Sequence, residues 1–251
     1  MLENAPQTTP VVVLEEEPSG GIPNAPWLEH LVAQLAQVRS GMNADSVHQL
    51  RVAVARLRVW LALGGRRALR DDLKWLRDRA AALRDLDVQL ASNPPPAWAS
   101  ELLKRRERAR KRMLASLESP RLRGLLIALA SSPPVPQVRA RIEARRIVHK
   151  VLRRARRTED PHGIHRLRCA VRRLRFALEW LGTPMAAFER LQDVLGAVSD
   201  ALAAERALQQ TRRPDRAVRQ RLRKVRRDLT RHSRAAREVW KQVEPLVLEM
   251  R

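Results

Sequence analysis

The sequence has few of the residues that characterise secreted, membrane-spanning or strand-rich proteins. It contains one cysteine, so no disulfide can form within the chain and nothing suggests an oxidising compartment. Aromatic residues make up 3% of the 251 residues, with no tyrosine and two phenylalanines, and the alternation typical of β-strands is weak. No apolar run approaches a membrane span, and no lysine or arginine precedes Arg39, which fits neither a secretory nor a mitochondrial targeting segment. We therefore expect an all-α, soluble, cytoplasmic protein with no membrane partner.

Positive charge is the most pronounced feature that is present. Lys and Arg number 50 against 27 Asp and Glu, which gives a formal net charge of +23, while 44% hydrophobic residues suffice for a packed core. Such a charge attracts polyanions, and the candidates are nucleic acid, an anionic membrane surface and inorganic phosphate polymer. Only six of the basic residues are lysine. Arginine contacts phosphate oxygens at two points, but genomic base composition also enriches it, so its abundance alone identifies no partner.

Proline and glycine divide the chain. Residues 1–25 are rich in both and are predicted to form a flexible N-terminal segment. A helical domain is predicted for residues 26–251, with halves at about 26–132 and 136–251 separated by a proline cluster. Periodicity and helix-stop signals predict helices at about 26–40, 44–63, 67–91, 97–118, 122–130, 137–157, 161–181, 184–210 and 215–243.

The two halves contain a repeated segment. Residues 48–58 read HQLRVAVARLR, and residues 165–175 read HRLRCAVRRLR. A shift of 117 positions aligns His48 with His165, Arg51 with Arg168, Val54 with Val171, Arg56 with Arg173, Leu57 with Leu174, Arg58 with Arg175 and Leu61 with Leu178. The repeat predicts an internal duplication, and hence two antiparallel helical bundles related by approximate two-fold symmetry.

Each repeated segment forms two stripes on a helical wheel. The first helix places Leu50, Val54, Leu57 and Leu61 within roughly 60° of one another, and the second does the same with Leu167, Val171, Leu174 and Leu178. A neighbouring stripe carries cations: His48, Arg51 and Arg58 in the first helix, and His165, Arg168, Arg172 and Arg175 in the second. Like charges in a row repel one another, so a row that lies beside the buried face, and is repeated at the same register, is expected to line a groove and suggests a counter-anion.

The two histidines lie in the first turns of their predicted helices. Asp45 or Ser46 is the expected cap of the first helix, and Asp160 that of the second. Helix N-termini favour anions, and a histidine there can become protonated beside a phosphate. The alternative is that His48 and His165 serve capping or packing alone.

Other residues of the second segment have more ordinary interpretations. His162 and His165 have the spacing of metal ligands, but no cluster of Cys or carboxylates completes such a site, so no metal site is predicted. Cys169 is expected to be a buried structural thiol. Glu179 is expected to pair with Arg175, four residues before it, although a solvent-facing pair of little worth is the alternative.

The repeated histidine and arginines resemble the CHAD family, the conserved histidine α-helical domain. Further similar segments are LRDLDV at 83–88 and LQDVLGAVSD at 191–200, and the resemblance covers about residues 26–243. It implies an all-helical, pseudo-symmetric fold with a basic central groove or channel. It also implies binding of inorganic polyphosphate and association with polyphosphate granules.

The sequence departs from the family pattern at several positions. Ala55 stands where the second half has Arg172 and where the family usually has a base, so the first-half site is expected to be weaker. Phe176 replaces a more usual tyrosine, and Ser199 a more usual asparagine. No strand-rich segment with alternating glutamates is present to form the triphosphate-tunnel domain that many relatives carry, so the chain is expected to be the standalone form.

We therefore predict a non-enzymatic protein that binds inorganic polyphosphate through paired His/Arg helices and needs no cofactor or metal. The candidate binding residues are His48, Arg51, Arg56, Arg58, Lys74, Arg77, Arg84, His165, Arg168, Arg172, Arg173 and Arg175. A nucleic-acid-binding protein using the same surface is the alternative, which the shortage of stacking residues disfavours. An enzyme acting on phosphate polymers is a third, but it needs a carboxylate cluster that the sequence lacks. The sequence gives no oligomeric state.

Overall fold

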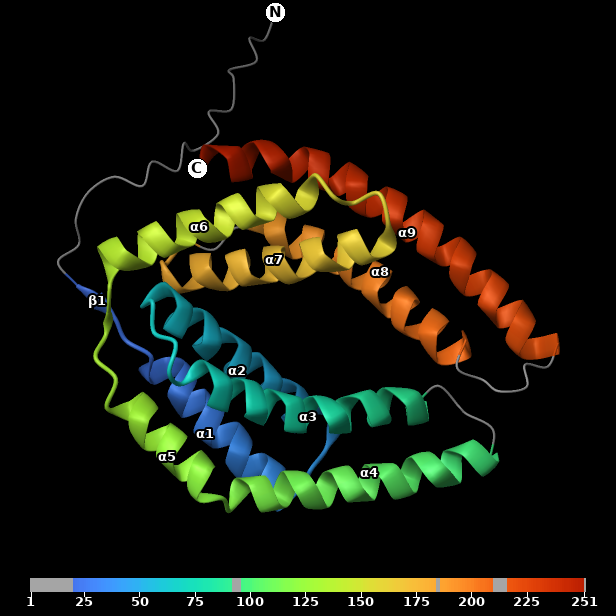
Figure 1. Ribbon diagram of the computed structural model, residues 1–251, viewed down its shortest axis with the longest axis horizontal. Coiled ribbons are helices and arrows are strands. Elements are labelled where there is room, and N and C mark those ends of the chain that lie inside the picture. Colours follow the sequence, from blue (N-terminus) through green and yellow to red (C-terminus); the bar gives the residue numbers. More distant parts are fainter. Residues whose placement is uncertain (1–19, 92–95, 184–185, 210–215, 251) are drawn as a thin grey trace, which may run out of the picture. The chain divides into compact units, whose positions relative to one another are not determined.

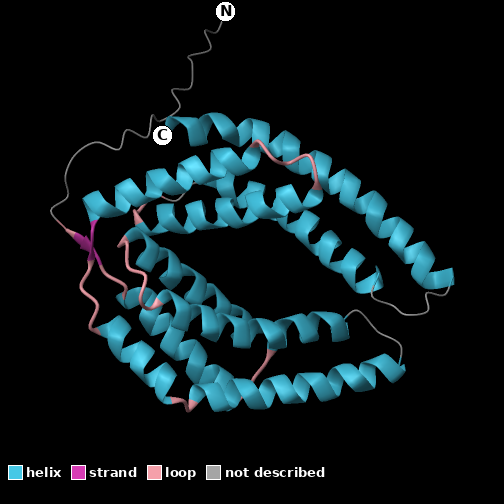
Figure 2. Ribbon diagram, in the orientation of Figure 1, coloured by secondary structure: helices cyan, strands magenta, loops and turns pink. Residues whose placement is uncertain are grey.

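The computed structural model describes residues 20–91, 96–183, 186–209 and 216–250. In these ranges the regular secondary structure is helical apart from one short antiparallel strand pair, and loops join the elements, as Figure 2 shows. The helices are α1 (Ala25–Ser40), α2 (Ala44–Leu63), α3 (Arg70–Ala91), α4 (Pro96–Leu117), α5 (Pro120–Ala130), α6 (Gln137–Ala155), α7 (Pro161–Trp180), α8 (Ala186–Gln209) and α9 (Arg216–Glu249). The all-α prediction is confirmed. Residues 1–19 of the flexible segment predicted at 1–25 lie outside the described residues.

The chain divides into two compact units. The N-terminal unit comprises Gly20–Glu143 together with Glu179–Gly182, and the C-terminal unit comprises Ala144–Leu178 and the described residues from Thr183 onward. The internal duplication and the basic groove inferred from the sequence stay predictions.

The N-terminal unit is a bundle of α1 to α5, coloured blue to green in Figure 1. Within it α2 packs between α1 and α3, and α3 also packs on α4 and α5. Strands β1 (Gly21–Ile22) and β2 (Val135–Pro136) pair in register, Gly21 with Pro136 and Ile22 with Val135. This pair ties the start of the unit to its end. The fully buried Trp60 of α2 adds to the tie, because its indole Nε1 donates a hydrogen bond to the Ile22 carbonyl at 2.8 Å.

The C-terminal unit contains most of α6 and α7 with α8 and α9. α8 packs along α9, which the sequence predicts to end near Val243 but which continues to Glu249 through Pro245. A proline inside a helix costs about 3 kcal/mol. Val243 and Val247 are both buried on either side of it. Burial of these two side chains offsets the lost backbone hydrogen bond. Local sequence signals do not register this burial. Among the described residues, no helix has the length and apolar character needed to cross a bilayer.

Candidate functional site

The first predicted cationic row lies on α2 of the N-terminal unit. Its core stripe is confirmed, because Leu50, Val54, Leu57 and Leu61 are fully buried. His48 is exposed in the first turn, and Arg51 and Arg58 are half-buried beside the core stripe, as the wheel predicts. The expected cap was wrong: Asn43 caps α2, and its side-chain oxygen accepts a hydrogen bond from the Ser46 backbone N–H at 2.7 Å. His48 therefore follows a capped helix start, where backbone N–H groups favour an anion.

Arg56 has a different environment from the rest of this row. Its Nε donates to Glu179 at 2.8 Å, and its guanidinium lies 4.1 Å from the centre of the Trp27 ring. Its backbone carbonyl accepts from the Trp180 indole at 3.0 Å. The Arg56 side chain is only 12% exposed. These contacts attach Glu179 and Trp180, which belong to the N-terminal unit, to α2. This is a structural task, and we expect Arg56 to contribute less to ligand binding than Arg51 and Arg58. Glu179 was expected beside Arg175, and the structure shows its carboxylate bound to Arg56.

The candidate residues of α3 fall into two groups. Lys74 and Arg77 both donate to Asp78, at 2.8 Å and 2.7 Å. These hydrogen bonds, the Lys74 bond foremost, lower the pKa of Asp78, so this carboxylate stays ionised and neutralises part of their charge. Arg84 is half-buried and has no ion-pair partner among the described residues. Of the three, Arg84 has the guanidinium most available to an anion.

The second predicted row lies on α7 of the C-terminal unit. The core stripe of this helix is again confirmed, with Leu167, Val171, Leu174 and Leu178 all buried. The expected cap is also confirmed, because the Asp160 carboxylate accepts from the Gly163 backbone N–H at 2.7 Å. That hydrogen bond is the main cause that lowers the pKa of Asp160. The helix therefore begins at a defined position one turn before His165.

His165 is held in a chain of hydrogen bonds. Its Nδ1 lies 3.0 Å from the Ser199 hydroxyl of α8, and that hydroxyl donates to the Leu195 carbonyl at 3.2 Å. Because the hydroxyl proton points at Leu195, the Ser199 oxygen accepts from Nδ1–H and leaves the lone pair on Nε2. Cys169 lies one turn along α7, with its Sγ 3.8 Å from Nε2. The prediction of a buried thiol was wrong: Cys169 is exposed, because position 169 lies on the cationic side of the helix.

Cations surround His165. Burial is the main cause that lowers its pKa below the ordinary 6.5, and repulsion from Arg168, Arg206, His162 and Arg166 lowers it further. The terminal guanidinium nitrogen of Arg206, on α8, lies 2.9 Å from His162 Nδ1. The imidazole of His165 is therefore mainly neutral near pH 7 until an anion offsets these charges.

The arginines of the α7 row flank this histidine at helical spacing. Arg168 is half-buried, and its Nε is enclosed without a hydrogen-bond partner among the described residues. Arg172 and Arg175 lie against the buried Phe176, with guanidinium carbons 5.3 and 5.4 Å from the ring centre. Phe176 thus forms an apolar support for two cations. Arg173 is half-buried on another side of the helix.

Sequence reasoning missed two members of this cluster. Ser199 was noted only as a departure from the family pattern, although its hydroxyl contacts His165. Arg206 was not noted at all. The two lie seven residues apart on α8 and therefore share a face, which is the one signal that single-sequence analysis offered. Among described residues no three His, Cys, Asp or Glu side chains are grouped as metal ligands would be.

Comparison with known proteins identifies the family of this chain. The family model described as CHAD domain matches residues 25–209. The chain belongs to the CHAD family. The crystal structure of the CHAD domain from the plant Ricinus communis is similar, with 25% identity and a TM-score of 0.60 over 89% of this chain and 84% of that one. PptA from Streptomyces chartreusis has 18% identity and a TM-score of 0.67, over 90% and 97% of the two chains. No curated protein matches.

Members of the CHAD family bind polyphosphate or related compounds. The match to the CHAD model spans α1 to α8 and so includes both histidine helices, α2 and α7. Both cationic rows therefore lie within the matched residues, whereas α9 lies beyond them.

Proposed function

We propose that this CHAD chain binds inorganic polyphosphate, without hydrolysing it, through the cationic rows of α2 and α7. The observation that carries the proposal is the α7 row. There His165 is surrounded by cations that lower its pKa, and the enclosed Nε of Arg168 has no acceptor among the described residues. A donor enclosed without a partner, beside a histidine whose protonation neighbouring cations oppose, is costly unless an anion binds there.

The chemistry of the row favours a phosphate polymer over nucleic acid. Guanidinium groups bind phosphate oxygens through paired N–H donors, and polyphosphate offers such oxygens without bases. A nucleic-acid strand would add bases, which proteins bind on exposed aromatic rings. The ring beside Arg172 and Arg175 is Phe176, which is buried at 2% exposure and presents no such platform. The row therefore matches the charge of a phosphate chain and offers nothing to a base.

A competition experiment tests the proposal. Long-chain polyphosphate bound to the purified protein should resist displacement by short DNA or RNA offered at equal phosphate concentration, and its affinity should fall steeply with salt. Fluorescence anisotropy of labelled polyphosphate measures both. Ready displacement by nucleic acid would overturn the polyphosphate assignment, and release of inorganic phosphate from the polymer would contradict the non-enzymatic part. Association with polyphosphate granules, part of the same proposal, is tested by fluorescence microscopy of the tagged chain.

Binding is also expected to strengthen as the pH falls. The pKa of His165 lies below 6.5 in the free protein because burial and neighbouring cations disfavour the imidazolium. A bound phosphate reverses this repulsion and raises the pKa, so binding takes up a proton, and affinity rises by up to about tenfold per unit of pKa difference as pH falls through that window. The folding stability of the ligand-free protein changes with pH in the opposite direction. It falls below pH 6.5, because protonation of a group whose folded pKa is lowered costs stability.

Anisotropy titrations between about pH 5.5 and 8 measure this dependence. His165→Gln should flatten the pH profile, while His232→Gln, which removes a histidine on α9, should leave it unchanged. An unchanged slope in His165→Gln would show that the proton is taken up elsewhere. The sequence-based idea that the α2 and α7 rows line one groove stays a prediction.

A further inference from the structure

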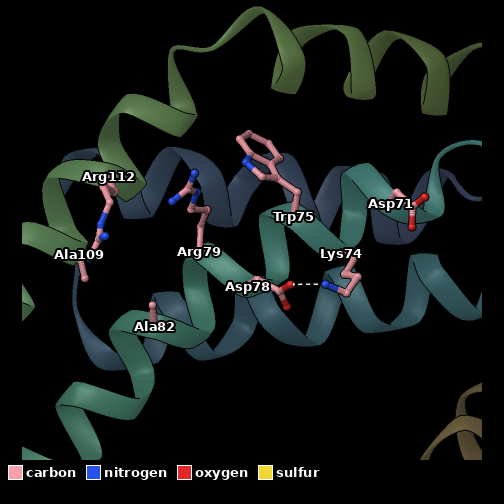
Figure 3. Close-up of a pocket in the computed structure, with 8 residues that line it drawn as sticks. All are labelled: Asp71, Lys74, Trp75, Asp78, Arg79, Ala82, Ala109 and Arg112. Carbon is pink, nitrogen blue, oxygen red and sulfur yellow. Dashed lines mark hydrogen bonds and ion pairs between the residues drawn. The ribbon is translucent and has the colours of Figure 1, made fainter.

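A pocket of about 580 Å³ lies between α3 and α4 of the N-terminal unit. Figure 3 shows its lining residues, with Trp75 and Arg79 extending from α3 and Arg112 from α4. Its volume is within the range of pockets that hold small organic ligands, about 300–1,000 Å³. The polyphosphate proposal does not use this pocket, although Lys74 lies at its edge.

One end of the pocket carries two guanidinium groups without acidic partners. The Nε of Arg79 is enclosed and has no hydrogen-bond partner among the described residues. Arg112 is exposed, and its guanidinium has no ion pair within the described ranges. Asp78 cannot neutralise them, because its carboxylate is bound by Lys74 and Arg77. This end of the pocket therefore carries two guanidinium groups that no carboxylate of the described residues neutralises, which suits a phosphate group.

An aromatic ring occupies the middle of the pocket. Trp60 and Trp240 are buried in the core. Trp75 is only half-buried and lines the pocket. Arg121 fixes it, because the guanidinium lies 4.7 Å from the ring centre and is held by Asp72 at 2.7 Å. A fixed indole beside a cavity is a surface on which a flat ring can pack.

The other end of the pocket carries an acceptor. Asp71 is exposed and lies one turn before Trp75 on α3. At about 1.5 Å of rise per residue, the eight positions from Asp71 to Arg79 span roughly 12 Å. Figure 3 shows Asp71 at one end and Arg79 and Arg112 at the other. A complementary ligand has a negative group, a flat ring and a hydrogen-bond donor, in that order.

We propose that this pocket binds a nucleoside monophosphate. Arg79 and Arg112 bind the phosphate, Trp75 packs against the base, and Asp71 accepts from an amino group at the far edge of the base. This function is separate from polyphosphate binding. Inorganic phosphate or polyphosphate lacks the ring and would use only the arginine end.

Isothermal titration calorimetry of the full chain with AMP, GMP and inorganic phosphate tests the proposal. At least one nucleotide should bind about tenfold or more tightly than phosphate, and Arg112→Ala should weaken nucleotide binding by about tenfold or more, since a charge-assisted hydrogen bond to the phosphate is lost. Lys111→Ala is the matched control. It removes the same charge from the neighbouring exposed position, which does not line the pocket, and should leave affinity within about twofold.

Two further variants locate the nucleotide. Trp75→Leu should weaken nucleotide binding and leave phosphate binding unchanged, with circular dichroism confirming the fold. Arg168→Ala combined with Arg175→Ala should leave nucleotide binding unchanged, because both residues lie on α7. Equal affinity for phosphate and nucleotides, no effect of Arg112→Ala, or loss of nucleotide binding in the α7 double variant would each overturn the assignment.

Discussion

Replacing Arg168 and Arg175 together with alanine is expected to weaken polyphosphate binding by at least about a hundredfold while the helical fold persists. Each arginine that makes a charge-assisted hydrogen bond to phosphate contributes roughly 1.5–3 kcal/mol, and 1.4 kcal/mol is a tenfold change in affinity. Both side chains are half-buried beside the core stripe and not within it, so the helix keeps its packing. Anisotropy titration at fixed salt measures the loss, and circular dichroism with thermal melting checks the fold.

The matched control removes two charges from elsewhere in the C-terminal unit. Arg190 and Arg234 are exposed. Arg190 lies nine residues before Ser199, so by helical geometry it points to the opposite side of α8 from the His165 contact. Arg190→Ala combined with Arg234→Ala should change affinity by no more than about threefold, the effect of lower net charge alone. Equal losses in the two double variants would mean that polyphosphate binds by overall charge and not at the α7 row.

Alkylation of Cys169 can show where the polymer lies. Cys169 is the only cysteine of the chain, it is exposed, and its Sγ lies 3.8 Å from His165 Nε2. Polyphosphate bound along the row should slow its alkylation in the wild type and not in the Arg168/Arg175 double variant. Unchanged alkylation at saturating polyphosphate would place the polymer elsewhere.

The parts of the fold that could be predicted are those set by local periodicity. The stripe of Leu57 and its neighbours, and that of Leu174, follow from the 3.6-residue repeat, and all of their members are buried. Glycine and proline gave the helix ends, as where α2 stops and Gly65 adopts a φ of +67°. Pro245 is the exception, because a stop signal was outweighed by the burial of Val243 and Val247.

The contacts that could not be predicted join residues far apart in sequence. Helix rules direct attention to the arginine four residues before Glu179, and they give no sign of the ion pair that its carboxylate forms with Arg56, 123 positions away. Likewise His165 and Ser199 are 34 residues apart, so the sequence pattern does not predict the hydrogen bond between them that fixes the imidazole. Periodicity predicts which face of a helix is cationic. It does not predict which groups of another helix orient those cations, because that depends on how the helices pack.

Gly163→Ala is expected to be the most destabilising small substitution on the histidine helix. A methyl group at this position would lie 1.9 Å from the Arg157 carbonyl oxygen and 3.3 Å from the Thr158 Cα. Both are backbone atoms, so no side-chain rotation relieves the overlap, and the turn before α7 must move. Such overpacking costs about 2 kcal/mol or more of unfolding free energy. Chemical denaturation followed by circular dichroism measures the loss.

Gly196→Ala in α8 is the matched control, since no atom of the described residues beyond the adjoining backbone of α8 lies within 4 Å of its added methyl group. There the lower helix propensity of glycine dominates, and alanine should raise stability by about 0.5–1 kcal/mol. The two substitutions should thus have opposite signs. Gly163 lies two residues before His165, and its backbone N–H donates to the capping carboxylate of Asp160. Its replacement should therefore reduce polyphosphate affinity as well. Equal stability of the two variants would mean that the turn before α7 adjusts freely, and that the close approach at Gly163 does not fix the position of His165.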